Sequence, residues 1–126
     1  MLKRLLFLFI LPAVLLFACS NNDNNEELAF IDVDFVVPEE TIDAGETVEL
    51  LANVTYGDEI ETDAVVKFEV WLSGDQDNSE TFEATNNGDG SYTADYTFEE
   101  AGTYEMYAHT DAQNMHTMPK KEVTVE

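Results

Sequence analysis

The fold of this 126-residue chain is decided by the stretch Ser91-Tyr-Thr-Ala-Asp-Tyr-Thr-Phe-Glu-Glu-Ala-Gly-Thr-Tyr-Glu-Met-Tyr-Ala-His-Thr110. Apolar residues alternate with polar ones from Tyr92 to Phe98, and the same alternation returns from Tyr104 to Ala108. A period of two is typical of strands that bury one face. The segment Glu99–Gly102 between them is short and contains a glycine. The stretch therefore predicts two strands joined by a turn.

The same alternation continues on both sides of this stretch. Further strands are predicted, in chain order, at Ala29–Val37, Val48–Tyr56, Val65–Leu72, Glu80–Thr85 and Lys121–Val125. Turn residues separate them, most clearly the cluster Asn86–Gly90. Seven short strands without a helical segment indicate an all-β fold, an immunoglobulin-like antiparallel β-sandwich of about seven strands, formed by residues 28–126. The step Ala101-Gly-Thr-Tyr104 resembles the tyrosine corner of such sandwiches.

The N-terminus has the features of an export signal. Lys3 and Arg4 precede an apolar run that ends at Ala18, which predicts a signal peptide over residues 1–18. Leu16-Phe-Ala-Cys19 resembles a bacterial lipobox, in which the cysteine is lipidated and becomes the first mature residue. Polar residues 19–27 then form a tether. We expect an extracytoplasmic lipoprotein anchored to the bacterial cell membrane through Cys19, the alternatives being ordinary secretion or an uncleaved anchor.

The charge of the predicted mature chain limits its partners. Three lysines remain against 27 acidic residues, a net charge of −24. Such a field repels nucleic acid and anionic lipid surfaces. The carboxylates are spread along the chain, which favours a solvated acidic surface over a dedicated metal store. Since Cys19 is the only cysteine, the domain forms without an intrachain disulfide.

One window near the C-terminus has the composition of a metal site. It holds both histidines, His109 and His116, and three of the four methionines, Met106, Met115 and Met118. Imidazole suits copper and zinc, and thioether selects Cu(I), so this set favours copper, with Cu(I) preferred. Met106 shares the parity of core residues and is expected to pack inside. The expected ligands are His109 and His116 at the base of a hairpin, Met118 beside them, and Met115 reaching in from the loop tip.

Each of these side chains also has a plain structural interpretation, as a surface histidine or as apolar cover for the end of the sandwich. Elsewhere, Trp71 lies opposite in parity to the core residues of its strand, and with Tyr107 it could form an exposed aromatic surface for a protein partner. No arrangement of nucleophile and base points to catalysis. We therefore expect no enzymatic activity.

Four segments resemble the YtkA-like domain of exported bacterial lipoproteins, which is related to the FixH group. They are Val65–Trp71, Gly88–Tyr92, Ala101–Tyr104 and, as the most distinctive, Met115-His-Thr-Met-Pro-Lys-Lys121. The resemblance extends from about Val33 to the C-terminus. It implies a role in assembling respiratory haem-copper oxidases by handling copper, with His109, Met115, His116 and Met118 as its residues. The alternative is a metal-free structural or adaptor domain that binds another envelope protein.

Overall fold

The computed structural model describes residues 29–126. The predicted signal peptide (1–18), Cys19 and the tether (19–27) lie outside the described residues. In the described part of the chain, no helix has the length and apolar character needed to cross a membrane.

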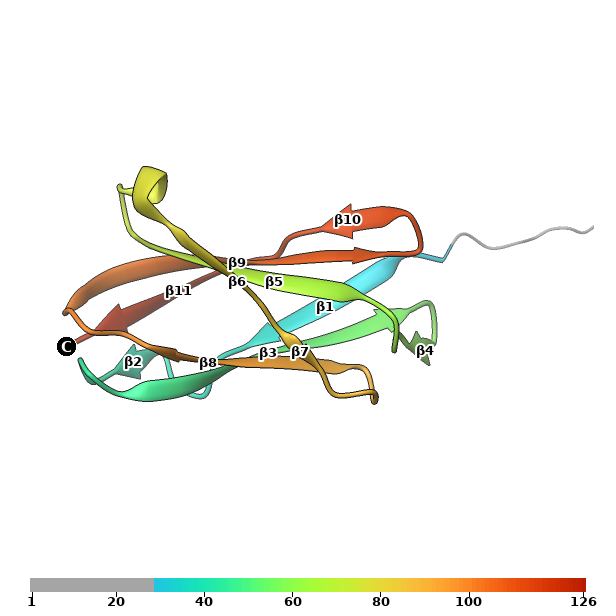
Figure 1. Cartoon of the computed structure of the whole chain (residues 1–126), viewed down its shortest axis with the longest axis horizontal. Coiled ribbons are helices and arrows are strands. Elements are labelled where there is room, and N and C mark those ends of the chain that lie inside the picture. Colours follow the sequence, from blue (N-terminus) through green and yellow to red (C-terminus); the bar gives the residue numbers. More distant parts are fainter. Residues whose placement is uncertain (1–28) are drawn as a thin grey trace, which may run out of the picture.

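Two sheets form the domain, and Figure 1 shows their strands running along its long axis. The first sheet contains, in spatial order, β1 (Ile31–Val36), β3 (Thr47–Tyr56), β8 (Ser91–Thr97) and β7 (Thr85–Asn86), with β4 (Glu59–Ile60) paired to β3. The second contains β2 (Thr41–Ile42), β11 (Lys120–Val125), β9 (Gly102–Ala112), β5 (Val65–Leu72) and β6 (Glu80–Glu83), with β10 (Met115–Thr117) paired to β9. The start of β1 and the β9–β10 hairpin lie at one end of the molecule, and the C-terminus lies at the other (Figure 1).

The predicted β-sandwich is confirmed, with additions. All seven expected strands are present, and β2, β4, β7 and β10 are extra strands of two or three residues. A three-residue 3₁₀ helix, η2 (Gln76–Asn78), lies between β5 and β6. One of the added strands, β2, pairs with β11 in parallel, while the seven predicted strands pair antiparallel. This short strand crosses to the second sheet, where Glu40 and Ile42 accept backbone hydrogen bonds that the edge of β11 would otherwise leave unmade.

The core lies between the sheets and follows the predicted alternation. Phe68, fully buried on β5, packs its ring 5.3 Å from that of Phe35 on β1. Met106 is also fully buried, which confirms the prediction that it is a packing residue. Tyr92 is 1% exposed, and its hydroxyl donates to the Glu61 carbonyl oxygen at 2.7 Å. The polar atom of this large core residue is thereby satisfied.

The turn into β9 has the geometry that its sequence suggests. The Tyr104 hydroxyl donates to the backbone carbonyl of Glu100, four residues upstream, at 2.9 Å. This is the hydrogen bond of a tyrosine corner, so the prediction at Ala101–Tyr104 is confirmed. The contact fixes the start of β9, the strand whose far end bears His109.

Candidate metal centre

A two-residue turn positions the histidines. Gln113 and Asn114 connect β9 to β10. Their φ values are 54° and 60°, the positive dihedrals of a type I′ hairpin turn. His116 on β10 lies opposite Asp111 on β9, two residues beyond His109. Alternate residues of a strand share a face, so both histidines lie on the outer face of the second sheet. Their ring centroids are 5.6 Å apart.

The strand-pairing register places Met118 on the same face of the sheet as the histidines. Thr117 of β10 lies opposite Thr110, and Lys120 of β11 lies opposite Tyr107, so an unbroken register places Met118 opposite His109. The hydrogen bond from the Ala108 amide to the Pro119 carbonyl, at 3.0 Å, supports this continuity. Residues directly opposite each other share a face of the sheet. Met118 is 39% exposed, so a ligand from solvent can reach this residue.

Met115 does not take the place expected for it. It pairs with the buried Ala112 and packs against the core, on the face opposite to His116. A small groove of about 270 Å³ between β10 and the start of β1 is lined by Phe30, Met115 and His116. The expectation that Met115 reaches the histidines from the loop tip is thus wrong, because the two-residue turn makes it the first residue of β10 and points it inward.

His109 is held by a carboxylate that sequence reasoning did not assign to the site. Its Nε2 lies 2.8 Å from Glu69 Oε1, and the side chains are 24% and 15% exposed, respectively. The hydroxyl of Ser79 and the amide of Gln76 also donate to Glu69, at 2.7 and 3.5 Å. The hydrogen bond from His109, together with those from Ser79 and Gln76, holds the pKa of Glu69 below its ordinary 4.5, although desolvation acts in the opposite direction.

His116 makes a similar but more exposed contact. Its Nδ1 lies 2.7 Å from Asp111 Oδ1, and these side chains are 44% and 61% exposed. An ionised carboxylate can only accept a hydrogen bond, so the proton of neutral His109 is on Nε2 and that of neutral His116 is on Nδ1. The nitrogens outside these contacts are Nδ1 of His109 and Nε2 of His116. Two neutral imidazole nitrogens and one thioether can act together as ligands of a soft cation.

Of the two carboxylates that contact the histidines, Asp111 could have been predicted from the sequence and Glu69 could not. Asp111 has the parity of His109 and lies near it in the chain, so it could have been included. Glu69 is 40 residues away, and only the β5–β9 register brings it to His109. Within residues 29–126, no group of three or more His, Cys, Asp or Glu side chains is arranged to hold a metal ion.

The predicted exposed aromatic surface is wrong at Trp71. This side chain faces outward, as its parity requires, yet it is only 5% exposed. Tyr107 packs against it at 5.3 Å between ring centroids, and the Lys120 ammonium lies 5.8 Å from its ring. Lys120 also forms an ion pair with Glu105 at 2.6 Å. Long neighbouring side chains thus cover an outward-facing tryptophan.

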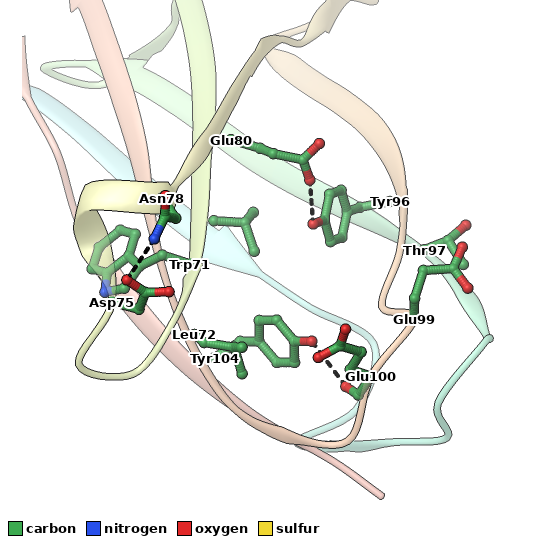
Figure 2. A pocket seen from close by; sticks show the side chains of 11 residues that line it. Trp71, Leu72, Asp75, Asn78, Glu80, Tyr96, Thr97, Glu99, Glu100 and Tyr104 are labelled. Atoms are coloured by element: carbon green, nitrogen blue, oxygen red, sulfur yellow. Dashed lines mark hydrogen bonds between the residues drawn. The ribbon is translucent and has the colours of Figure 1, made fainter.

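A separate cleft lies away from the histidines, near the beginning of β9. It has a volume of about 460 Å³, and its walls include Leu72 and Tyr104 (Figure 2). The hydroxyl of Tyr96 donates to Glu80 at 2.6 Å, and burial, reinforced by this carboxylate, raises the pKa of Tyr96. The cleft is lined by carboxylates, aromatic rings and aliphatic side chains, without His109, His116 or Met118. The candidate metal centre is therefore a surface site on β9 and β10, separate from this cleft.

Solved structures share the sandwich at low sequence identity. The soluble domain of PmoD from Methylocystis superposes with a TM-score of 0.52 at 11% identity, over 81% of this chain and 95% of that one. A CARDB domain from Pyrococcus furiosus, solved in complex with di-metal ions, gives 0.50 at 16% identity, over 83% and 95%. A putative glycoside hydrolase from Bacteroides vulgatus gives 0.52 at 15% identity over 70% of this chain, which spans only 16% of that enzyme. These likenesses show the fold alone. No curated protein matches the chain.

A family model described as YtkA-like matches residues 26–109. The match includes β1 through most of β9 and ends at His109. The segment Met115–Lys121, which carried the resemblance most distinctly in the sequence, lies beyond it. Because the match covers 84 of the 126 residues, the chain belongs to the YtkA-like family.

Proposed function

We propose that the protein binds copper, preferentially Cu(I), through His109, His116 and Met118, and delivers it to a respiratory haem-copper oxidase during assembly. The observation that carries this proposal is the pair of imidazoles 5.6 Å apart on one face, each hydrogen-bonded to a carboxylate. Metal-binding histidines commonly donate their second ring N–H to a carboxylate, which fixes the ring and its tautomer. Glu69 and Asp111 are placed to serve in that way.

The composition of the site favours copper over other metals. Hard cations such as Mg²⁺ and Ca²⁺ prefer oxygen ligands, and structural zinc sites use four nitrogen, sulfur or oxygen ligands. A thioether beside two neutral imidazoles suits Cu(I). Met118 therefore decides the preferred oxidation state, and the two histidines provide most of the affinity.

Exposure of the site supports transfer by ligand exchange, without turnover. His116 and Met118 are open to solvent, so an acceptor with better ligands can approach the metal directly. The resemblance to YtkA-like lipoproteins supplies the class of acceptor, an assembling haem-copper oxidase or its assembly factors. Lipidation at Cys19 would keep the domain at the extracytoplasmic face of the membrane where such an enzyme presents its copper sites. No enzymatic activity is proposed.

The metal-free adaptor remains the alternative, but its main support in the sequence is weakened. The adaptor hypothesis depended on an exposed aromatic surface at Trp71 and Tyr107. Trp71 is instead buried beneath Tyr107 and Lys120. An interface anchor has to be accessible to its partner. The copper hypothesis keeps three of its four predicted residues on one face, so it is the better supported function.

Met115 and Met118 provide a matched test of the proposed function. In a Cu(I) titration of the full chain against a competing chelator, Met118→Leu is expected to weaken binding by about tenfold or more, equivalent to about 1.4 kcal/mol, because leucine removes one of the three proposed ligands. Met115→Leu is expected to leave the affinity unchanged, because Met115 packs inward. Equal losses in the two variants, or no binding by the unmodified chain, would contradict the ligand set.

A further inference from the structure

The two histidine–carboxylate contacts of the candidate metal centre are chemically alike but unequal in their surroundings. Glu69 accepts three hydrogen bonds, from His109, Ser79 and Gln76, and its side chain is 15% exposed. The Asp111 side chain is 61% exposed and contacts His116, whereas Glu69 also accepts hydrogen bonds from two residues of the β5–β6 connection. An exposed pair of this kind gains little from its electrostatic attraction, whereas a partly buried and multiply bonded pair is held in one geometry.

The donors behind Glu69 belong to an ordered turn. Ser79 follows η2, and its amide donates to the Gln76 carbonyl at 3.0 Å. The side chain of Asn78 donates to Asp75 at 2.8 Å within the same connection. The β5–β6 segment therefore presents its hydroxyl and amide donors to Glu69 from a fixed backbone. His109 is thus positioned by a network that includes β9, β5 and η2.

The strand that bears His109 is also held more firmly in the sheet than the strand that bears His116. β9 is eleven residues long and lies inside the sheet, between β5 on one side and β10 and β11 on the other. β10 has three residues and extends from the two-residue turn at the end of a hairpin. Short hairpin ends open locally at lower free-energy cost than central strands. His116 can therefore move while His109 remains in place.

We infer that Glu69 is a positioning residue that fixes His109 as the anchoring ligand, and that His116 is the ligand that exchanges when copper is passed on. The assignment of anchoring and exchanging ligands rests on the proposed function, whereas the positioning of His109 by Glu69 does not require copper. With the Nε2 proton directed to Glu69, His109 offers Nδ1 to the metal. An acceptor would then approach from the side of His116 and Met118, with His109 releasing the metal last.

The positioning role is tested in the metal-free full chain. Long-range ¹H–¹⁵N NMR correlations at about pH 8, above the ordinary imidazole pKa, report which ring nitrogen carries the proton. We expect His109 to be protonated on Nε2 alone and Glu69→Ala to give a mixture of tautomers. Glu69→Gln should largely retain the native tautomer, because its amide oxygen can still accept the bond. Asp111→Ala should leave His109 unchanged. A His109 protonated on Nδ1, or one indifferent to Glu69→Ala, would overturn the inference.

The exchange order is tested with Cu(I) itself in the same variants. Loss of a carboxylate behind a metal-ligating histidine costs about 10–100-fold in metal affinity, and we expect Glu69→Ala to fall in this range. Asp111→Ala should lose less than about tenfold. Equal losses would overturn the assignment of anchoring and exchanging ligands. If the unmodified chain binds no Cu(I), the proposed function and this assignment fail together, and the NMR result still decides the role of Glu69. Urea unfolding of each variant serves as the control for folding.

Discussion

Replacing His109 and His116 together with alanine is expected to abolish tight Cu(I) binding, with a loss of more than about 100-fold. Removal of a carboxylate behind one ligand already costs about 10–100-fold, so removal of two ligands must cost more. Met118 would remain as the only soft ligand on this face. Competition with a Cu(I) chelator measures the loss, and the chelator also prevents weak binding by the acidic surface from being counted.

The double histidine variant needs a control that alters the same face without touching the ligands. Glu122 and Thr124 are exposed residues of β11, and their double replacement by alanine should leave Cu(I) affinity unchanged. The copper site proposed here would be refuted if the histidine variant bound Cu(I) as tightly as this control. A control that lost affinity to the same degree would attribute the binding to surface charge.

Phe68→Ala is expected to destabilise the domain by about 3–5 kcal/mol, the usual cost of removing a buried phenylalanine ring. Phe68 is fully buried and packs against Phe35 of the other sheet and Phe82 of its own, at 5.3 and 6.1 Å between ring centroids. Small domains have roughly 5–15 kcal/mol of total stability, so the variant should be close to unfolding. With Cys19 as the only cysteine, no intrachain disulfide offsets this loss.

Urea unfolding followed by the fluorescence of Trp71, the only tryptophan, measures this effect. Phe30→Ala is the matched control, because the same side chain is 64% exposed there and its removal should change stability by less than about 0.5 kcal/mol. Similar losses in the two variants would mean that Phe68 is not at the centre of the core.

The strands and their buried faces could be predicted from the sequence because burial in a strand has a period of two. The series Val48, Leu50, Ala52 and Val54 is buried throughout, as its alternation indicates. The short strands could not be found in this way, since two residues do not show a period. The parallel pairing of β2 depends on how the chain crosses between the sheets, which cannot be predicted from the local sequence.

The candidate metal centre shows a similar division between local and long-range information. His109 and His116 are close in sequence, and a hairpin brings them together in the way that their spacing suggests. The error at Met115 came from the turn, since its length sets the parity of every residue that follows. Glu69 and the cover over Trp71 depend on registers between distant strands. These contacts depend on the whole sandwich and cannot be predicted from the segment Met106–Met118 alone.

The central claim is that copper is held by two imidazoles and one thioether on the outer face of the second sheet. X-ray absorption at the copper edge of the Cu(I)-loaded full chain tests it most directly, because nitrogen and sulfur neighbours scatter differently. We expect two imidazole nitrogens and one sulfur around the metal, with the sulfur absent in Met118→Leu and retained in Met115→Leu. A shell of oxygen atoms alone, or a sulfur that persists in Met118→Leu, would contradict it.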